Sequence, residues 1–470
     1  FSPSRAFCKR SRGMVCRRVR RRGQALVVAI LALTVLTAGA IALSAAARLE
    51  LRAARRGVSA VGREAALRGA VNRGLALLDA ARADPAELRS TLRRYHALQW
   101  TPLVPQTDPD SPTVEVAVQI LDASARINLN TASEAQLRQL PDISSDTVSA
   151  ILGWRDERSR DDYGKSARPY EPKRRPFDTL EELLLVRDVD PALFFGAPGA
   201  RETVALRRPP LSEWLTTLSG ENNTDAEGNP RVDVNSATAE ELLEAANRNG
   251  QIVTSEQAQN LVQKRRQRET SSSSRGGGSK PAFRSVNEAL REAGVEEKHW
   301  GPVLDAWTVD RRTFLPARIN VNTAPPAVLQ AVGGMNEETA RKIVEQRAEK
   351  PGGLAWSDLL DLAASGGQPA ANPPPAGGGE GTPVLPPANG GSLSPDQIER
   401  LFCVRSSVYF VRCLVRVAGS GRTDAAMAMV YCPSPEEPAK VVQWRQPDRF
   451  PGWGAWYRPL GEEEEAVSGR

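Results

Sequence analysis

The chain has 470 residues, long enough for two or three domains, and 40% hydrophobic with 25% charged residues is typical of a globular protein. Its formal net charge of +6 would suggest a nucleic-acid partner if the charge were spread evenly. Nine of the 62 Lys and Arg residues, however, lie within residues 1–23, which contain no acid, so 53 bases face 56 acids in the rest. This slightly acidic remainder argues against a protein that binds phosphate backbones.

Residues 23–47 contain no charged side chain. As a helix they would span about 37 Å, more than the roughly 30 Å of a hydrocarbon core. The basic residues before this segment predict a cytoplasmic N-terminus and a translocated region 48–470. A cleaved secretory signal is the alternative, because Ser44-Ala45-Ala46-Ala47 offers small residues to a signal peptidase. We favour a retained transmembrane helix at 24–47, since the apolar run exceeds the usual signal core.

The helical pattern continues beyond the apolar run, to about residue 100. Apolar residues recur at spacings of three and four through Leu67, Val71, Leu75 and Leu78, which predicts one apolar helix face. Asp84-Pro85 predicts a break or a new helix start, because Pro is tolerated in a first helical turn.

Strand signals flank a long helical region. Residues 113–121 alternate between apolar and polar side chains, as in a half-buried strand. Three further strands are predicted within 400–445, separated by turn residues. We therefore expect an α+β protein whose small antiparallel sheet is formed by 113–121 and 400–445 and is interrupted by a large helical insert.

The insert contains a sequence repeat, R-[IV]-[ND]-[LV]-N-[TS]-A, which begins at Arg126, Arg231 and Arg318. The apolar residues would anchor a short extended segment, and Asn/Thr or Asn/Ser would cap the helix that follows. The polar motif residues are Asn128, Asn130 and Thr131, then Asp233, Asn235 and Ser236, then Asn320, Asn322 and Thr323. The predicted segments are helical modules at 126–220, 231–310 and 318–365, a Pro/Gly linker at 366–391 and a C-terminal tail at 446–470.

Together these features resemble the K-type minor pseudopilins of type II secretion, the general secretion pathway protein K family. The resemblance rests on the basic leader ending in Arg22-Gly23, the repeat, the stretch from Trp154 to Val186, and the strand set ending in Val441–Trp444. It implies a pilin-like fold interrupted by an insert with helix-hairpin-helix or SAM-like repeats. It further implies a protein that is no enzyme, sits at the pseudopilus tip, initiates assembly and supports protein export.

The resemblance also implies how the N-terminus is processed. Residues 1–23 would be a prepilin-type leader that prepilin peptidase removes between Gly23 and Gln24, after which Gln24 is N-methylated. Val28 then occupies the fifth mature position, where most pilin-like subunits carry Glu. An apolar residue suits a tip subunit, because a carboxylate in lipid needs a partner and no subunit lies beyond the tip. Initiation at Met14 would leave a leader of ten residues.

The partners implied by the resemblance are the I- and J-type minor pseudopilins, the major pseudopilin and prepilin peptidase. The implied location is the inner membrane, with a single pass, a cytoplasmic N-terminus and a periplasmic C-terminal region. Two other functions stay open: a membrane-anchored helix-hairpin-helix DNA-uptake receptor and a signal-anchored exported adaptor. DNA binding is disfavoured because Asp142-Ile143-Ser144 replaces the Gly-x-Gly hairpin through which such repeats approach phosphate.

The sequence offers little for catalysis or cofactors. The only histidines, His96 and His299, lie in no metal-ligand or triad-like setting, and no catalytic residue is expected. Calcium is the one possible ligand, because Asp156, Asp161 and Asp162 cluster, although we favour a solvated acidic loop paired with neighbouring arginines. Two of the three C-terminal cysteines could pair in an oxidising compartment: Cys403, Cys413 and Cys432.

Overall fold

The computed structural model describes a membrane-type helix and a large folded region. The described residues are 16–103, 113–156, 170–195, 210–273, 281–333, 335–365, 393–417, 423–434 and 436–446. Internal contacts divide the chain into two compact units, Phe1–Ala66 and Leu67–Arg470. Helix α1 (Cys16–Ala81) passes from the first unit into the second.

The first unit is the N-terminal part of α1. Its segment Leu26–Arg52 is long and apolar enough to cross a membrane, and none of it is buried in the structure. Its large apolar side chains are exposed, for example Val28 at 66% and Leu36 at 71%. Such a surface is unfavourable in water and favourable in lipid, so this helix fits the predicted single-pass membrane anchor.

In the second unit, the end of α1 packs on the sheet. Leu67, Val71 and Leu78 are buried, as the spacing predicts. Gly74 lies at the closest approach, where a Cβ would stand 2.4 Å from Val411 Cγ1. The predicted continuation as a helix to residue 100 is wrong, because α1 ends at Ala81.

The predicted break at Asp84-Pro85 is confirmed. Helix α2 (Pro85–Arg94) begins there, with Asp84 as N-cap accepting a hydrogen bond from Ala86 N and with Pro85 in the first turn. Pro85 lacks an N–H and Asp84 satisfies one of the N–H groups left without a partner, so this sequence starts a helix efficiently. The Arg89 guanidinium of α2 then donates to the carbonyls of Lys350 and Arg347 in the insert.

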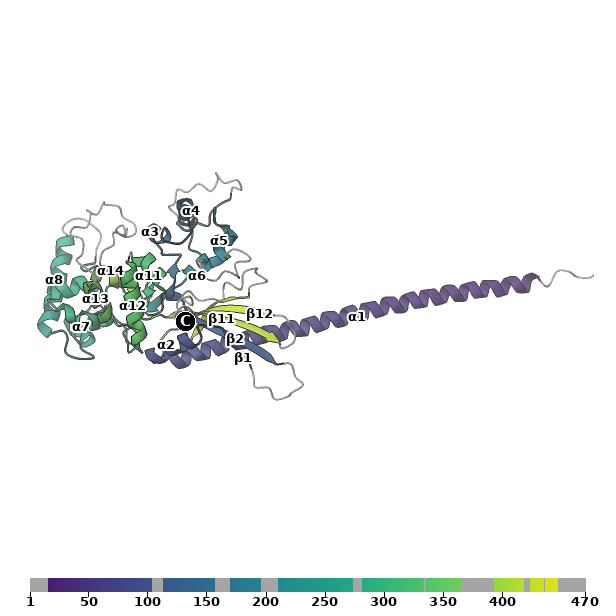
Figure 1. Ribbon diagram of the computed structural model, residues 1–470, viewed down its shortest axis with the longest axis horizontal. Coiled ribbons are helices and arrows are strands. Elements are labelled where there is room, and N and C mark those ends of the chain that lie inside the picture. Colours follow the sequence, from purple (N-terminus) through teal and green to yellow (C-terminus); the bar gives the residue numbers. More distant parts are fainter. Residues whose placement is uncertain are drawn as a thin grey trace, which may run out of the picture. The chain divides into compact units, whose positions relative to one another are not determined.

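The sheet has five antiparallel strands in the order β1-β2-β11-β12-β13. Strands β1, β2, β11 and β12 are labelled in Figure 1. The bounds of the five strands are Trp100–Pro102, Val114–Asp122, Val408–Val417, Thr423–Tyr431 and Lys440–Arg445. Strand β2 pairs with β11 from Val114↔Val417 to Asp122↔Tyr409, so the sheet closes across the insert as predicted. Strand β1 was not predicted, because three residues that include a proline carry no alternation.

The insert contains three modules, each bounded by two short strands that pair in parallel. The first comprises β3 (Ile127–Asn128), α3 (Glu134–Leu137), α4 (Ser145–Arg155), η3 (Leu180–Leu185), α5 (Pro191–Phe195), α6 (Leu211–Trp214) and β4 (Leu215–Thr216). The second comprises β6 (Val232–Asp233), α7 (Ala239–Ala246), α8 (Ser255–Ser273), α9 (Val286–Ala293), η5 (Glu297–His299), α10 (Trp300–Ala306) and β7 (Trp307–Thr308). The third comprises β9 (Ile319–Asn320), α11 (Pro326–Gly333), α12 (Glu337–Glu349), α13 (Trp356–Ser365), α14 (Pro395–Leu401) and β10 (Phe402–Cys403).

Two short connections link these modules to the sheet. The turn η1 (Ala123–Ala125) follows β2, and β5 (Gly220–Asn222) pairs antiparallel with β8 (Phe314–Pro316). The third module extends beyond the predicted 318–365, because β9 pairs with β10 on the far side of the linker. Residues 402–403 consequently belong to this module, and the sheet strands after the insert begin at Val408. The linker 366–391 and the tail from residue 447 lie outside the described residues.

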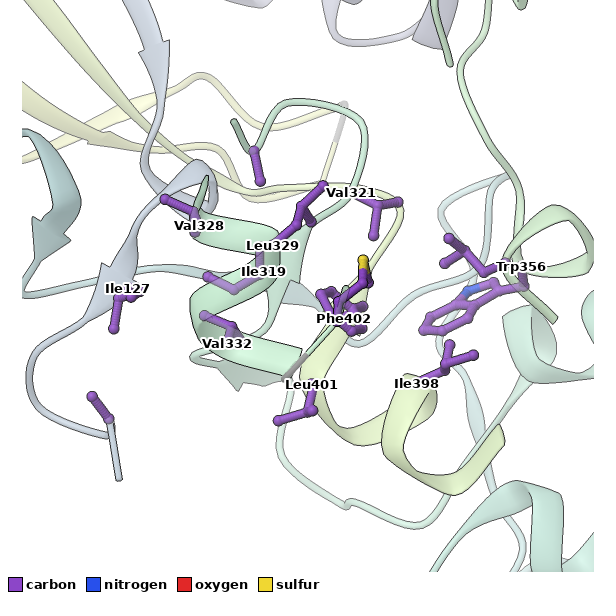
Figure 2. Close-up of a cluster of buried hydrophobic side chains, with 14 of the residues drawn as sticks. Ile127, Ile319, Val321, Val328, Leu329, Val332, Trp356, Ile398, Leu401 and Phe402 are labelled. Carbon is purple, nitrogen blue, oxygen red and sulfur yellow. The ribbon is translucent and has the colours of Figure 1, made fainter. Parts of the chain in front are cut away.

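One hydrophobic core runs through all three modules, from Ile127 in the first to Phe402 in the third. In the third module, the side chains of Ile319 and Val321 lie among those of Leu329 and Phe402, between α11 and α14 (Figure 2). Leu129, Val234 and Val321 are all fully buried, so the apolar motif positions anchor each module as expected. A shared core means that the modules stabilise one another.

The cysteines Cys403, Cys413 and Cys432 are buried and free, so none of the three possible pairings among them is formed. Burial raises the pKa of the Cys432 thiol to about 12. Thiols in such surroundings stay protonated and behave as small apolar side chains.

We predict that Gly74→Ala destabilises the folded region even though alanine favours helices. The added Cβ would overlap Val411, and overpacking of this kind costs about 1–3 kcal/mol. Gly62→Ala is the matched control, because nothing lies within 4 Å of that position in the same helix and the change should be neutral or stabilising. Thermal unfolding of the detergent-solubilised chain by circular dichroism compares the two; equal midpoints would contradict the close helix–sheet contact.

Candidate functional site

Each copy of the repeat begins with an Asx turn. The side chains of Asn128, Asp233 and Asn320 each accept a hydrogen bond from the backbone N–H two residues later, at 2.9, 2.9 and 3.0 Å. This turn ends the short strand and directs the chain toward the next helix. The first polar position of the motif therefore has the same role in all three copies.

The second motif asparagine connects two distant parts of its module. Asn130 donates to the carbonyl of Phe177 and accepts from the N–H of the same residue, at 2.9 and 2.6 Å. Asn235 likewise donates to the carbonyl of Phe283 at 3.0 Å and accepts from the N–H of Phe283 at 2.8 Å. A primary amide that donates to and accepts from one residue imitates a pair of strand hydrogen bonds.

The third copy repeats the connection of the first, in which Asn130 also donates to the carbonyl of Thr217 at 3.0 Å. Asn322 donates to the carbonyls of Leu354 and Val404, at 3.0 and 2.9 Å, and accepts from Leu354 N at 2.7 Å. Gly353 lies against it with φ +85°, and a Cβ there would stand 2.6 Å from Asn322 Oδ1. A glycine is therefore required both by the backbone conformation and by the space.

The predicted helix-capping role of the motif is wrong. The N-caps of α3 and α7 are Ser133 and Thr238, each in a reciprocal capping box with the glutamine or glutamate three residues later. Asn130 and Asn235 are occupied by the distant chain and cannot cap. The third motif residues bond elsewhere: Ser236 donates to Asp233 Oδ2 at 2.8 Å, and Thr323 donates to Asp122 Oδ2 at 2.6 Å. Thr131 donates only to the Asn128 carbonyl, at 3.4 Å.

Three arginines complete the modules in a role that we did not predict from the sequence. Arg155 donates to the carbonyls of Leu129 and Ala132 at 2.8 and 2.9 Å, so one guanidinium holds both sides of the motif turn. The other two modules repeat this contact: Arg265 bonds Val234 and Ala237, and Arg347 bonds Val321 and Ala324. Each arginine ends the pattern [IL]-[LV]-x-x-R, which begins at Ile151, Leu261 and Ile343. That pattern was the available sequence signal.

Buried carboxylates join the modules to one another and to the sheet. Glu221 is 1% exposed and accepts from the guanidinium of Arg231 at 3.2 Å and from that of Arg318 at 3.0 Å. Burial raises the pKa of Glu221, but these two arginines outweigh it and leave the pKa below its ordinary value. Glu213 similarly accepts from Arg126 of the first module and from Arg412 of β11.

Of the three candidate cation ligands, only Asp156 lies among the described residues. Asp156 forms an ion pair with Arg155 at 2.8 Å, and Asp161 and Asp162 lie outside the described residues. Within the described part of the chain, no group of three or more His, Cys, Asp and Glu side chains is placed to hold a metal ion. Calcium binding thus has no geometric support from Asp156.

The residues of the predicted processing site lie in helix α1. Gly23 and Gln24 are within it, and only their backbone is described. Val28, four residues beyond Gln24, is exposed on the apolar surface of the same helix.

We predict that Asn130→Asp opens the first module. The change replaces the amide donor by an oxygen that faces the carbonyls of Phe177 and Thr217, and unsatisfied groups of this kind cost about 1–3 kcal/mol. Gln139→Glu is the matched control, because it makes the same amide-to-carboxylate change on an exposed residue of the same module. Limited proteolysis and thermal unfolding measure the effect; equal behaviour of the two variants would show that the amide connection does not hold the module closed.

We compared the chain with protein-family models, curated proteins and solved structures. A family model for type II secretion system (T2SS), protein K, matches residues 319–376, which include β9 and helices α11 to α13. A chain in the crystal structure of the GspK–GspI–GspJ complex from the enterotoxigenic Escherichia coli type 2 secretion system is 13% identical, with a TM-score of 0.38. That alignment covers 84% of this chain and 100% of the other, but a score this low carries no structural argument. No curated protein matches. Through residues 319–376, the resemblance of this chain to the type II secretion system protein K family is confirmed.

Proposed function

We propose that this chain is a minor pseudopilin of a type II protein secretion system, located at the tip of the pseudopilus, where it initiates assembly and supports protein export. The observation that carries the proposal is the family match at 319–376 in a chain that also has an exposed apolar N-terminal helix. The helix would anchor the subunit in the inner membrane before assembly. In the filament it would pack against the helices of other pseudopilins.

The apolar surface of α1 supports a role in assembly. Leu31, Val35 and Leu36 are each more than 60% exposed, and the described residues contain nothing that covers them. A surface of this kind needs either lipid or other apolar helices. The same residues would contact lipid in the membrane-bound subunit and the helices of neighbouring subunits in the assembled filament.

The side chain at position 28 supports the tip location. A carboxylate at the fifth mature position would need a partner within lipid, which pilin-type assembly supplies through the α-amino group of the neighbour toward the tip. Val28 has no such need. A subunit without a neighbour on that side is therefore the one in which valine is least costly.

We further propose that the insert is a protein-interaction region of helix-hairpin-helix type. The turn between α3 and α4 contains Asp142 with φ +58°, where a DNA-binding hairpin would have glycine. Its carboxylate, together with Asp146 in the first turn of α4, would repel a phosphate approaching the helix N-terminus. The proposed partners are the I- and J-type minor pseudopilins and the major pseudopilin.

Co-expression with the I- and J-type subunits of the same secretion system tests this function. We expect the full chain to co-purify with both in one stoichiometric complex after detergent extraction. The control is the same chain mixed with duplex DNA, for which we expect no salt-dependent binding. Absence of a complex together with salt-dependent DNA binding would favour the DNA-receptor alternative and contradict the tip role.

Processing is tested by mass analysis of the membrane-extracted chain after co-expression with prepilin peptidase. We expect removal of everything up to Gly23, one methyl group on Gln24, and loss of both changes in Gly23→Ala. Gly39→Ala is the matched control, because this helical glycine has no neighbour within 4 Å and should leave processing unaltered. A mature chain that begins after Ala47 would instead identify an exported adaptor. Peptides from residues 1–13 would exclude initiation at Met14.

A further inference from the structure

A small cavity lies between the first module and the sheet. Its polar lining comes from both parts: Arg126, Ser212, Thr216, Thr217, Arg412 and Arg445. The space open to the centre of a water-sized sphere is about 10 Å³. That is room for a single water molecule or monatomic ion, and it excludes phosphate and sulfate. The cavity has no part in the proposed function.

Two hydrogen-bond donors in this lining have no partner among the described residues. Ser212 is 2% exposed, and its Oγ forms no hydrogen bond. The Nε of Arg445 is also buried and unbonded, although the other two nitrogens of this guanidinium bond Glu181 and Gln443. Buried donors without an acceptor are unfavourable and rare. Both donors therefore indicate an acceptor in the cavity that they line.

The charge of the lining favours an anion over a water molecule. Three guanidinium groups line the cavity, and no Asp or Glu among the described residues does. Glu213 pairs with Arg126 at 2.7 Å and with Arg412 at 3.2 Å, so one carboxylate serves two cations. Glu181 pairs with the third, Arg445. The described groups around the cavity thus have one more positive charge than negative charges.

The pKa of Arg126 supports this imbalance. Burial lowers the pKa of Arg126 to about 10; Glu213 opposes that fall, and the nearby Arg412 adds to it. The carboxylate consequently does not restore what the guanidinium loses on leaving water. A second negative charge close by would stabilise the protonated arginine.

From these observations we propose that the cavity binds a single chloride ion. Ser212 Oγ and Arg445 Nε donate hydrogen bonds to the ion, and the guanidinium groups of Arg126 and Arg412 balance its charge. Because the lining belongs to both the module and the sheet, the ion holds the first module against strands β11 and β13. The proposal concerns the folded region alone and does not depend on the proposed function.

The test is differential scanning calorimetry of the full detergent-solubilised chain. Sodium chloride is replaced stepwise by sodium gluconate at constant ionic strength, because gluconate is too large for the cavity. We expect the unfolding midpoint to rise by about 2 °C for each tenfold increase in chloride above half-saturation. Bromide, which is also monatomic, should act as chloride does.

Ser212→Ala should raise the chloride concentration of half-maximal effect about tenfold, because a hydrogen bond to a charged group is lost. Ser149→Ala is the matched control, since it makes the same change on an exposed serine of α4 in the same module and should leave the chloride response unaltered. Should Ser212→Ala not fold, Arg445→Gln removes the other unpaired donor. The same weaker response is then expected, measured as the dependence on chloride and not as the midpoint itself.

Equal midpoints in chloride and gluconate for the wild-type chain would overturn the proposal and identify the occupant of the cavity as water. A chloride response that is unaltered in Ser212→Ala, or in Arg445→Gln where that variant is used, would overturn it too, because the ion would then bind elsewhere. A response weakened in these variants and kept in Ser149→Ala supports the site.

Discussion

The fold depends on pairing strand β2, before the long insert, with strand β11 after it, and Asp122 lies where the two strands flank the insert. It is the last residue of β2 and pairs with Tyr409 at the start of β11. Its buried carboxylate accepts hydrogen bonds from Ser124 N, Asn320 Nδ2, Thr323 Oγ1 and Ser406 Oγ, at 2.6–2.8 Å. Burial raises the pKa of Asp122, and these four donors oppose the rise. One side chain thus ties the end of the first sheet half to the third module and to the beginning of the second sheet half.

Within the insert, each module is also closed by pairing between its first and last strands. Each module begins with one short strand and ends with another that pairs with it in parallel. The second motif asparagine bonds the backbone near the middle of its module. The modules then lock together through buried charge. Glu399 of α14 accepts from the backbone N–H groups of Val286 and Asn287, so the third module caps helix α9 of the second. If the two modules separated, these N–H groups at the start of α9 would lose the carboxylate and would have to bond to water instead.

Local signals made much of this architecture predictable. The uncharged segment, the alternation in 113–121 and the start of α2 at Asp84-Pro85 each depend on neighbours in the sequence, and the structure contains all three. The repeat marks where each pair of short parallel strands begins, but the partners of its asparagines are remote. Asn130 bonds Phe177, which only the folded chain brings near, so local capping rules assigned the wrong role. Strands of two residues, such as β3 and β4, carry no period that a sequence could reveal.

Closure by short parallel strands also explains how the third module tolerates its long Pro/Gly segment. Strands β9 and β10 fix both ends of the module, since Ile319 pairs with Phe402 and Asn320 with Cys403. Asn322 reinforces the closure by bonding Val404 directly after β10. The entropic cost of closing a loop grows only logarithmically, by about 0.6 kcal/mol for each doubling of length. Residues can therefore be added between α13 and α14 at little cost in stability, provided that these pairs and the contacts at Asp122 are kept.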